Sequence, residues 1–323
     1  MRDIKFARQV IDEEMSVFNR KFAEYLKSKT PLLDQILKFI IRRKGKQLRP
    51  MFVLLSARIA GEINDSTYRA ASLVELLHTA TLVHDDVVDE SIERRGFFSV
   101  NALWKNKVAV LVGDYLLSKG LLLSTENNDF QHLHILSDAV RQMSEGELLQ
   151  IEKTRRLNFS EEVYFEIIRK KTASLIASAC AVGAYSARGN KEIAERMRSF
   201  GEKAGIAFQI KDDLLDYGKE KIGKPTGNDI KEKKLTLPLI YTLQHADSQL
   251  KKELVYIIKN ENTEPARVNF ALEKIKASGG LDYANSKMCA YRDEALEILH
   301  SFEPSDSRKA LEELVAFTTD REY

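Results

Sequence analysis

The sequence has few cysteines, few prolines and no strong excess of charge, and each shortage excludes a class of protein. Only two of its 323 residues are cysteines, Cys180 and Cys289, and no C-x-x-C pair is present. This excludes a zinc or disulfide framework and fits a reducing compartment. The 50 basic and 48 acidic residues give a formal net charge of +2, which argues against a basic nucleic-acid-binding module.

Long apolar runs are also scarce. Residues 1–5 contain no apolar segment of the kind found in a signal peptide. The apolar stretch 108–117 is interrupted by Gly113 and Asp114, whereas a membrane span needs about 20 apolar residues. We therefore expect a cytoplasmic protein that binds no nucleic acid.

The residue pattern is helical. No proline occurs between Pro50 and Pro225, and apolar residues recur three and four apart. Alternating strand patterns and Asn-Gly or Asp-Gly turns are missing. We predict an all-α fold in a single domain over residues 1–323, because no linker or low-complexity tract divides the chain.

The expected helices are separated by short connections. Two segments do not fit a helix: the basic segment 42–50 and the glycine-, lysine- and aspartate-rich segment 217–234, a candidate lid. The expected helices cover residues 3–28, 31–42, 49–61, 66–90, 98–104, 107–124, 129–153, 160–188, 191–216, 234–244, 248–259, 264–278, 280–300 and 306–320.

Two D-D-x-x-D clusters each close an apolar helical segment. Residues four apart lie one above the other on a helix, so each cluster places at least two carboxylates on one face. Crowded carboxylates at a helix C-terminus repel one another and oppose the macrodipole, which favours a bound cation. The six acids are Asp85, Asp86 and Asp89, and Asp212, Asp213 and Asp216.

Mg²⁺ is the cation that these clusters favour. It takes oxygen ligands, and one or two carboxylates plus a substrate phosphate often suffice. For either cluster alone, an ordinary solvated helix end is the simpler interpretation, but two copies after apolar runs are hard to explain in that way. A di-iron bundle would need paired Glu-x-x-His motifs, which are absent.

Several basic segments could hold phosphate groups. Gly45-Lys46-Gln47-Leu48-Arg49-Pro50 brings two cations to the start of a helix, where backbone amides favour anions. Each of these segments could equally be a solvated surface. The other candidates are Arg94 and Arg95 after the first aspartates, Lys171 (with Thr172) inside a helix, and Lys224 and Lys234 in or beside the candidate lid, where Asp229 also lies.

The order of these motifs resembles the trans-isoprenyl diphosphate synthases, also called polyprenyl synthetases. The resemblance extends from about residue 35 to the C-terminus. It rests on five motifs in family order: GKQLRP, HDDVVDESIERRG, EGELLQ, KT and FQIKDDLLDYGKEKIGKPTGND-x-x-x-K-x-T-L-P. One departure is Lys233, where the family usually has glycine before the last lysine.

The resemblance implies a bundle of antiparallel helices around a deep central cavity, with the aspartate clusters facing each other across its mouth. It implies three Mg²⁺ ions held by the six aspartates, and a catalytic set comprising Asp85, Asp86, Asp89, Lys171, Thr172, Gln209 and Asp212. The allylic diphosphate would contact Arg94, Lys171, Lys224 and Lys234. Isopentenyl diphosphate would contact Lys46, Arg49, His78 and Arg95.

The resemblance also implies successive condensation of isopentenyl diphosphate with an allylic prenyl diphosphate. The positions four and five residues before the first aspartate, Thr81 and Ala80, help form the cavity floor in this family. Neither residue is aromatic, so we expect a product longer than fifteen carbons, used for quinone side chains. We also expect a homodimer and, because the product is lipid-soluble, peripheral membrane contact.

Three alternatives stay open. A shorter-chain farnesyl or geranylgeranyl diphosphate synthase would share all of these motifs. A class I terpene cyclase would need only one aspartate-rich motif and no isopentenyl diphosphate site. A non-catalytic subunit of a heteromeric synthase would usually lose one or both aspartate clusters, and both are intact here.

Overall fold

The computed structural model describes residues 4–42, 45–94, 97–156, 160–218 and 227–320. The fold is all-α, as the sequence predicts, apart from one pair of two-residue strands. Its elements are α1 (Lys5–Val10), α2 (Asp12–Tyr25), α3 (Pro31–Arg42), α4 (Leu48–Ala60), α5 (Asp65–Val88), β1 (Glu93–Arg94), β2 (Phe97–Phe98), α6 (Val100–Glu126), α7 (Phe130–Arg156), α8 (Glu161–Ile168), the π-helical turn η1 (Arg169–Ala173), α9 (Ser174–Arg188), α10 (Lys191–Asp216), α11 (Asn228–Lys231), α12 (Leu237–His245), α13 (Ser248–Asn260), α14 (Pro265–Ala277), α15 (Gly280–His300) and α16 (Asp306–Thr319).

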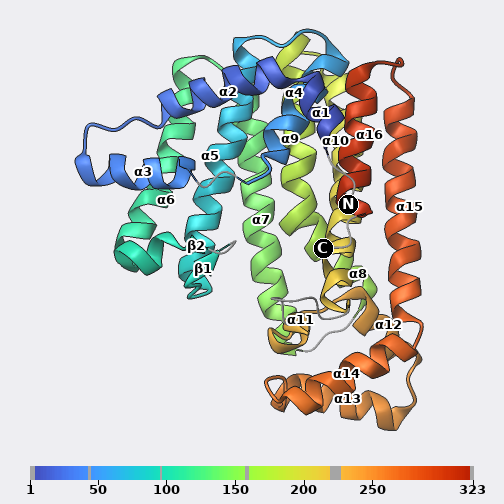
Figure 1. The fold of residues 1–323 in the computed structure, drawn as a ribbon. Helices are drawn as coiled ribbons and strands as arrows, with labels where there is room; N and C mark the ends of the chain where they lie inside the picture. The colour runs from blue at the N-terminus through green and yellow to red at the C-terminus, as the bar shows by residue number, and fades with distance from the viewer. Residues whose placement is uncertain (1–3, 43–44, 95–96, 157–159, 219–226, 321–323) are drawn as a thin grey trace.

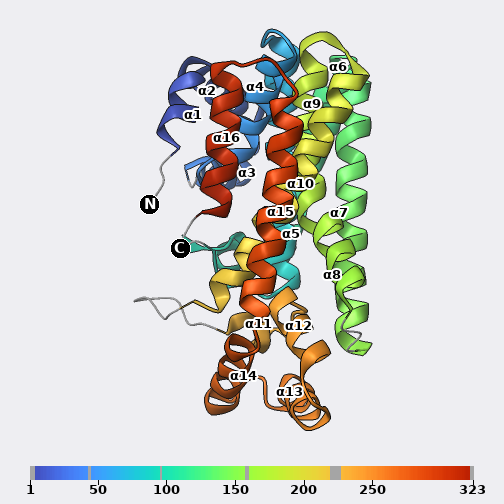
Figure 2. The same ribbon diagram turned by 90° about the vertical axis from the view of Figure 1, so that its right-hand side faces the viewer.

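The long helices run side by side. α5, α7, α9, α10, α15 and α16 are roughly parallel to one axis, and α13 and α14 lie across the lower end of the bundle (Figures 1 and 2). Helix α9 is central, because it packs against α4, α5, α7 and α10. The C-terminal ends of α5 and α10, where the two aspartate clusters lie, are both in the lower half of the molecule (Figure 1).

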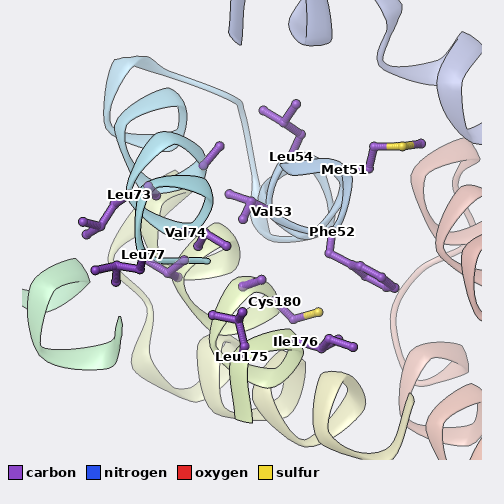
Figure 3. Close-up of a cluster of buried hydrophobic side chains, with 14 of the residues drawn as sticks. Met51, Phe52, Val53, Leu54, Leu73, Val74, Leu77, Leu175, Ile176 and Cys180 are labelled. Atoms are coloured by element: carbon purple, nitrogen blue, oxygen red, sulfur yellow. The ribbon is translucent and has the colours of Figure 1, made fainter. Parts of the chain in front are cut away.

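The main core forms where α4, α5 and α9 meet. Side chains from the three helices, including Val53, Val74 and Cys180, point toward one another there (Figure 3). Small residues allow the close approach: a Cβ on Gly183 would lie 2.2 Å from the carbonyl oxygen of Val53. A second apolar cluster joins α8, η1, α10, α12 and α15, and a third joins α11–α14. The three clusters together pack the ends of α5 and α10, where the acidic motifs lie.

The expected helices agree with the structure except at local interruptions. The predicted break between residues 104 and 107 is a kink inside α6, where Lys105 has φ 69° and ψ 161°. The predicted helix 3–28 is divided at Ile11, and the predicted helix 160–188 contains the π turn η1. The strands β1 and β2 were not expected, because two residues are too few to show any alternation.

Helix α6 differs from the expectation that no segment approaches a membrane span. It is long and apolar enough to cross a membrane by length and composition, and 39% of its most apolar window is buried inside the structure. The prediction was too strict because Gly113 and Asp114 interrupt the sequence run, but the other residues of the helix are apolar enough for an 18-residue stretch to meet the composition of a membrane span. Large apolar side chains on α6 are correspondingly exposed, among them Leu111 at 60%.

Candidate active site

A pocket of about 210 Å³ lies beside the second aspartate cluster. Its lining comes from α7, α8, η1, α10, α11 and the segment that follows α11. Six of the predicted site residues line it: Lys171, Thr172, Gln209, Asp212, Asp213 and Lys234. The other lining residues are Gln150, Tyr164, Ile167, Ile168, Asp229, Leu235 and Thr236.

The π turn η1 presents Lys171 and Thr172 to this pocket. One glycine on each neighbouring helix lets α7 and α10 approach η1 closely. A Cβ on Gly146 would lie 2.8 Å from the backbone nitrogen of Lys171, and a Cβ on Gly205 would lie 2.7 Å from Cα of Ala173. An inserted π turn often marks a functional site, because it redirects the side chains of one turn. The glycine in the EGELLQ motif is therefore explained by packing against η1.

A chain of hydrogen bonds links η1 to α10 and α8. The Thr172 hydroxyl donates to Oε1 of Gln209 at 2.8 Å, and Nε2 of Gln209 donates to Oδ1 of Asp213 at 2.8 Å. The Tyr164 hydroxyl donates to Oδ2 of Asp213 at 2.7 Å. Sequence reasoning did not select Tyr164, because a tyrosine in an apolar helix gives no signal of its role.

The two neighbouring acids of the second cluster have opposite environments. Asp212 is exposed, whereas Asp213 is 8% exposed. Burial raises the pKa of Asp213 to about 8, the charge of Asp229 adds to this rise, and the hydrogen bonds from Tyr164 and Gln209 oppose it. Burial also raises the pKa of Asp229, to about 6, against the charge of Lys234. The pocket thus carries both exposed and buried carboxyl groups.

Asp216 holds the start of α11 in place. Its Oδ1 accepts a hydrogen bond from the backbone of Asn228 at 3.1 Å, and its Oδ2 accepts one from the backbone of Asp229 at 3.0 Å. Lys234 lies 3.4 Å from Asp229 and 2.6 Å from Glu232. Burial alone would lower the pKa of Lys234, but these two carboxylates outweigh it and raise the pKa. The ion pairs keep Lys234 charged at the edge of the pocket.

Lys233, which departs from the family pattern, has φ 57°. This is the left-handed region that glycine adopts without steric cost, which explains the glycine usual at this position. Its Nζ donates a hydrogen bond to the carbonyl oxygen of Lys259 at 2.8 Å, at the end of α13. The lysine side chain thus ties this segment to the third apolar cluster.

The EGELLQ motif supplies polar partners for Lys171. The Nζ of Lys171 pairs with Glu147 and donates a hydrogen bond to Oε1 of Gln150 at 3.3 Å. Both partners lie on α7, which approaches η1 at Gly146. The motif signals these positions in the sequence, but only the fold connects them to Lys171.

The first cluster lies at the end of α5. Asp85 and Asp89 are exposed, Asp86 is 4% exposed, and the backbone of Asp89 donates to the carbonyl oxygen of Asp85 at 2.8 Å. The preceding His84 packs against α6, since a Cβ on Gly113 would lie 2.1 Å from its ring. Nε2 of His84 is also 3.5 Å from Asp114. The part of α6 that contains Gly113 and Asp114 therefore supports the end of α5.

The first cluster does not line the 210 Å³ pocket, whose acids come from α10 and α11. Among the described residues, no group of three or more histidine, cysteine or acidic side chains is arranged to hold a metal ion. The exposed carboxylates at the two helix ends, Asp85 and Asp89 on α5 and Asp212 on α10, still fit Mg²⁺. This ion often takes only one or two protein carboxylates and completes its shell with water and phosphate oxygens.

The predicted isopentenyl diphosphate residues lie at the start of α4 and along α5. Lys46 is exposed, with its Nζ 4.3 Å from the ring centroid of Phe317, and Arg49 lies in the first turn of α4. His78 is 8% exposed. Arg94 belongs to β1, where it is paired with Phe97. Two further predictions, Arg95 and Lys224, fall outside the described residues.

The predicted floor residues follow His78 on α5. Ala80 is fully buried in the main core, and Thr81 is partly buried, with its hydroxyl donating to the carbonyl oxygen of His78 at 2.9 Å. Neither of them lines the 210 Å³ pocket. Their role in product length stays a prediction.

Comparisons with known proteins identify the family. The polyprenyl synthetase family matches residues 30–275. The chain is 35% identical over 314 residues to an all-trans-nonaprenyl-diphosphate synthase (geranyl-diphosphate specific) from Rhodobacter capsulatus, covering 96% of each protein. It is 33% identical to an octaprenyl diphosphate synthase from Escherichia coli, again covering 96% of each. The crystal structure of a polyprenyl synthase from Caulobacter crescentus, complexed with calcium and isoprenyl diphosphate, superimposes with a TM-score of 0.91 at 37% identity, covering 99% of this chain and 98% of that one. The chain therefore belongs to the polyprenyl synthetase family.

Proposed function

We propose that the protein is a Mg²⁺-dependent trans-prenyltransferase of a single polyprenyl synthetase domain. It lengthens an allylic prenyl diphosphate by successive head-to-tail (1′-4) condensation with isopentenyl diphosphate. The observation that carries this proposal is the pocket where η1 brings Lys171 and Thr172 next to Gln209 and Asp212. In this arrangement the Lys171 cation can bind a leaving diphosphate, and the oxygen atoms of Thr172 and Gln209 can stabilise a developing carbocation.

The exposed acids are the proposed holders of the metal ions. Asp85 and Asp89 on α5 and Asp212 on α10 offer hard oxygen donors. Bound Mg²⁺ supplies positive charge that stabilises the departing diphosphate. Positive charge at Asp212 also favours the ionised form of the adjacent Asp213. We propose that three ions bind, and that Asp86 and Asp216 help these three residues to hold them.

The protein's own groups are proposed to bind the substrates and keep water out. Lys171 and Lys234 bind the allylic diphosphate, together with Arg94 and Lys224. The oxygen atoms of Thr172 and Gln209 face the cation that forms when the carbon–oxygen bond breaks, and Ile167, Ile168 and Leu235 exclude water from it. Isopentenyl diphosphate binds at Lys46, Arg49, His78 and Arg95, and its double bond attacks the cation. The released diphosphate accepts the proton that is then lost.

The proposed product is longer than fifteen carbons. The nonaprenyl and octaprenyl synthases to which the chain is similar make such products by name, and the small residues Ala80 and Thr81 would not block a growing chain. Use of the product for quinone side chains, a cytoplasmic location and peripheral membrane contact complete the proposal. A shorter farnesyl or geranylgeranyl product is the alternative.

A homodimer through α6 is part of the proposal. Val110 and Leu121 are eleven residues apart, which is close to three helical turns, so they lie on one face of α6. The residue after each of them, Leu111 and Leu122, is also exposed. Such a stripe of exposed apolar side chains favours a protein partner, and a second copy of this chain would cover it. Light scattering should give a dimer mass, and Leu111→Glu should lower it to that of a monomer. The partly exposed polar control Lys119→Glu should leave the mass unchanged. The exposed apolar residues of α6 are Leu103 at 45%, Val110 at 41%, Leu111 at 60%, Leu121 at 49% and Leu122 at 51%.

The deciding assay combines purified protein, isopentenyl diphosphate, geranyl or farnesyl diphosphate, and Mg²⁺, with products analysed by mass. Elongated prenyl diphosphates support the proposal. A hydrocarbon product would indicate a terpene cyclase, and turnover only after addition of a second chain would indicate a subunit. Asp212→Asn should reduce turnover by about 100-fold or more, and removal of Mg²⁺ by a chelator should abolish it. The matched control Asp306→Asn changes an acid in the first turn of α16, outside the site, and should retain full activity.

A further inference from the structure

We infer that Tyr164 is a positioning residue, which orients Gln209 and Thr172 by anchoring Asp213. The inference rests on the proposed function, because it assigns Tyr164 a part in that same reaction. Tyr164 lies on α8, two turns before Lys171, and is only 2% exposed. Its hydroxyl therefore has no access to bulk solvent and depends on a partner within the protein.

The partner of Tyr164 is the carboxyl group of Asp213, and each of its two oxygen atoms accepts a hydrogen bond. Oδ2 of Asp213 accepts from the Tyr164 hydroxyl at 2.7 Å, and Oδ1 accepts from Nε2 of Gln209 at 2.8 Å. A carboxyl group can rotate about its bond to Cβ, so one donor alone does not define its plane. Two donors from different helices, α8 and α10, do define it. The Tyr164 hydroxyl thus determines where Oδ1 lies relative to Gln209.

The position of Oδ1 determines the direction of the next two bonds. Because Nε2 of Gln209 faces Asp213, its carbonyl oxygen faces Thr172 and accepts the Thr172 hydroxyl hydrogen at 2.8 Å. The lone pairs of Thr172 Oγ1 are then left for the pocket. If the Gln209 amide were reversed, its nitrogen would donate to Thr172, and the hydroxyl hydrogen would be free to turn toward the pocket. A cation in the pocket is stabilised by the first arrangement and opposed by the second.

The test is Tyr164→Phe, which removes the hydroxyl and keeps the ring. We expect kcat for elongation to fall about 10- to 100-fold, while KM for isopentenyl diphosphate changes less than twofold. The matched control is Tyr283→Phe, which also removes a tyrosine–carboxylate hydrogen bond, from Glu161 at 2.7 Å, on residues that do not line the pocket. The control should keep kcat within twofold. Thermal unfolding of each variant measures the structural cost.

A double-mutant cycle separates positioning from general loss of stability. In a Thr172→Val background, which has no hydroxyl to orient, Tyr164→Phe should lower kcat less than twofold further. In a Thr172→Ser background, which keeps the hydroxyl, the loss should return to about 10-fold or more. Equal losses in the two backgrounds, or a Tyr164→Phe enzyme within twofold of wild type, would overturn the inference while leaving the proposed function in place. Absence of elongation by the wild-type protein would overturn both.

Discussion

Gly205→Ala is the substitution that most directly tests how the structure positions η1. A Cβ at this position would lie 2.7 Å from Cα and 2.9 Å from Cβ of Ala173, where 3.4 Å is the short end of ordinary contact. Helix α10 and η1 must therefore separate by about 0.7 Å. Thr172 precedes Ala173, and Gln209 lies one turn after Gly205, so the separation acts on their 2.8 Å hydrogen bond and extends it to about 3.5 Å, the limit for such a bond.

The expected stability change is small and the expected activity change is large. Overpacking costs about 1–3 kcal/mol, and replacing glycine by alanine inside a helix returns about 1 kcal/mol, so unfolding should become easier by about 0–2 kcal/mol. Loss of one hydrogen bond and a shift of this size in the site should lower kcat by roughly 10- to 100-fold. Elongation kinetics and denaturant unfolding measure the two effects separately.

Gly201→Ala provides the control, because it adds the same methyl group to the same helix one turn earlier. Its Cβ would lie 2.8 Å from Cα of Ala177, on α9 and beyond η1. We expect a similar change in unfolding free energy and a kcat within about threefold of wild type. The reasoning fails if Gly205→Ala keeps wild-type kcat, or if both variants lose activity in proportion to their loss of stability.

Three further predictions concern other parts of the chain. Ala80→Phe should shorten the product distribution on mass analysis, and an unchanged distribution would refute the proposed cavity floor. Lys233→Gly and Lys233→Ala both remove the side-chain bond to Lys259, but only glycine relieves the strain of the left-handed backbone at φ 57°. Lys233→Gly should therefore unfold at the same temperature as wild type or a few degrees higher, and Lys233→Ala at a lower temperature; the reverse order would contradict this account. Burial raises the pKa of Cys180 to about 12, so iodoacetamide at pH 8 should label the partly exposed Cys289 first, and rapid labelling of Cys180 in the folded protein would disprove its burial.

The helical character of the chain could be predicted because it depends on local spacing. Apolar residues three and four apart, the absence of proline over 51–224 and the helix end at each aspartate cluster are all properties of short segments. The kink at Lys105 lies in the predicted break between residues 104 and 107, and the start of α4 at Leu48 agrees with the predicted helix over 49–61. The interruption at Ile11, the strands β1 and β2 and the short helix α11 inside the segment 217–234, which was expected to be non-helical, do not follow the pattern. Neither does the π turn, because one residue added to a helix leaves its apolar period almost unchanged.

The residue types that we propose for the chemistry are visible in short sequence motifs: the two D-D-x-x-D clusters, the lysine–threonine pair and the basic helix start. The tertiary structure alone decided that Asp212 is exposed while Asp213 is buried beneath Tyr164. Adjacent residues on a helix point about 100° apart, so their environments depend on which side the neighbouring helices cover. The contact of Tyr164 with Asp213 joins positions 49 residues apart, and the close approach of α7 and α10 to η1 at Gly146 and Gly205 likewise joins distant segments, so no local pattern predicts either of them.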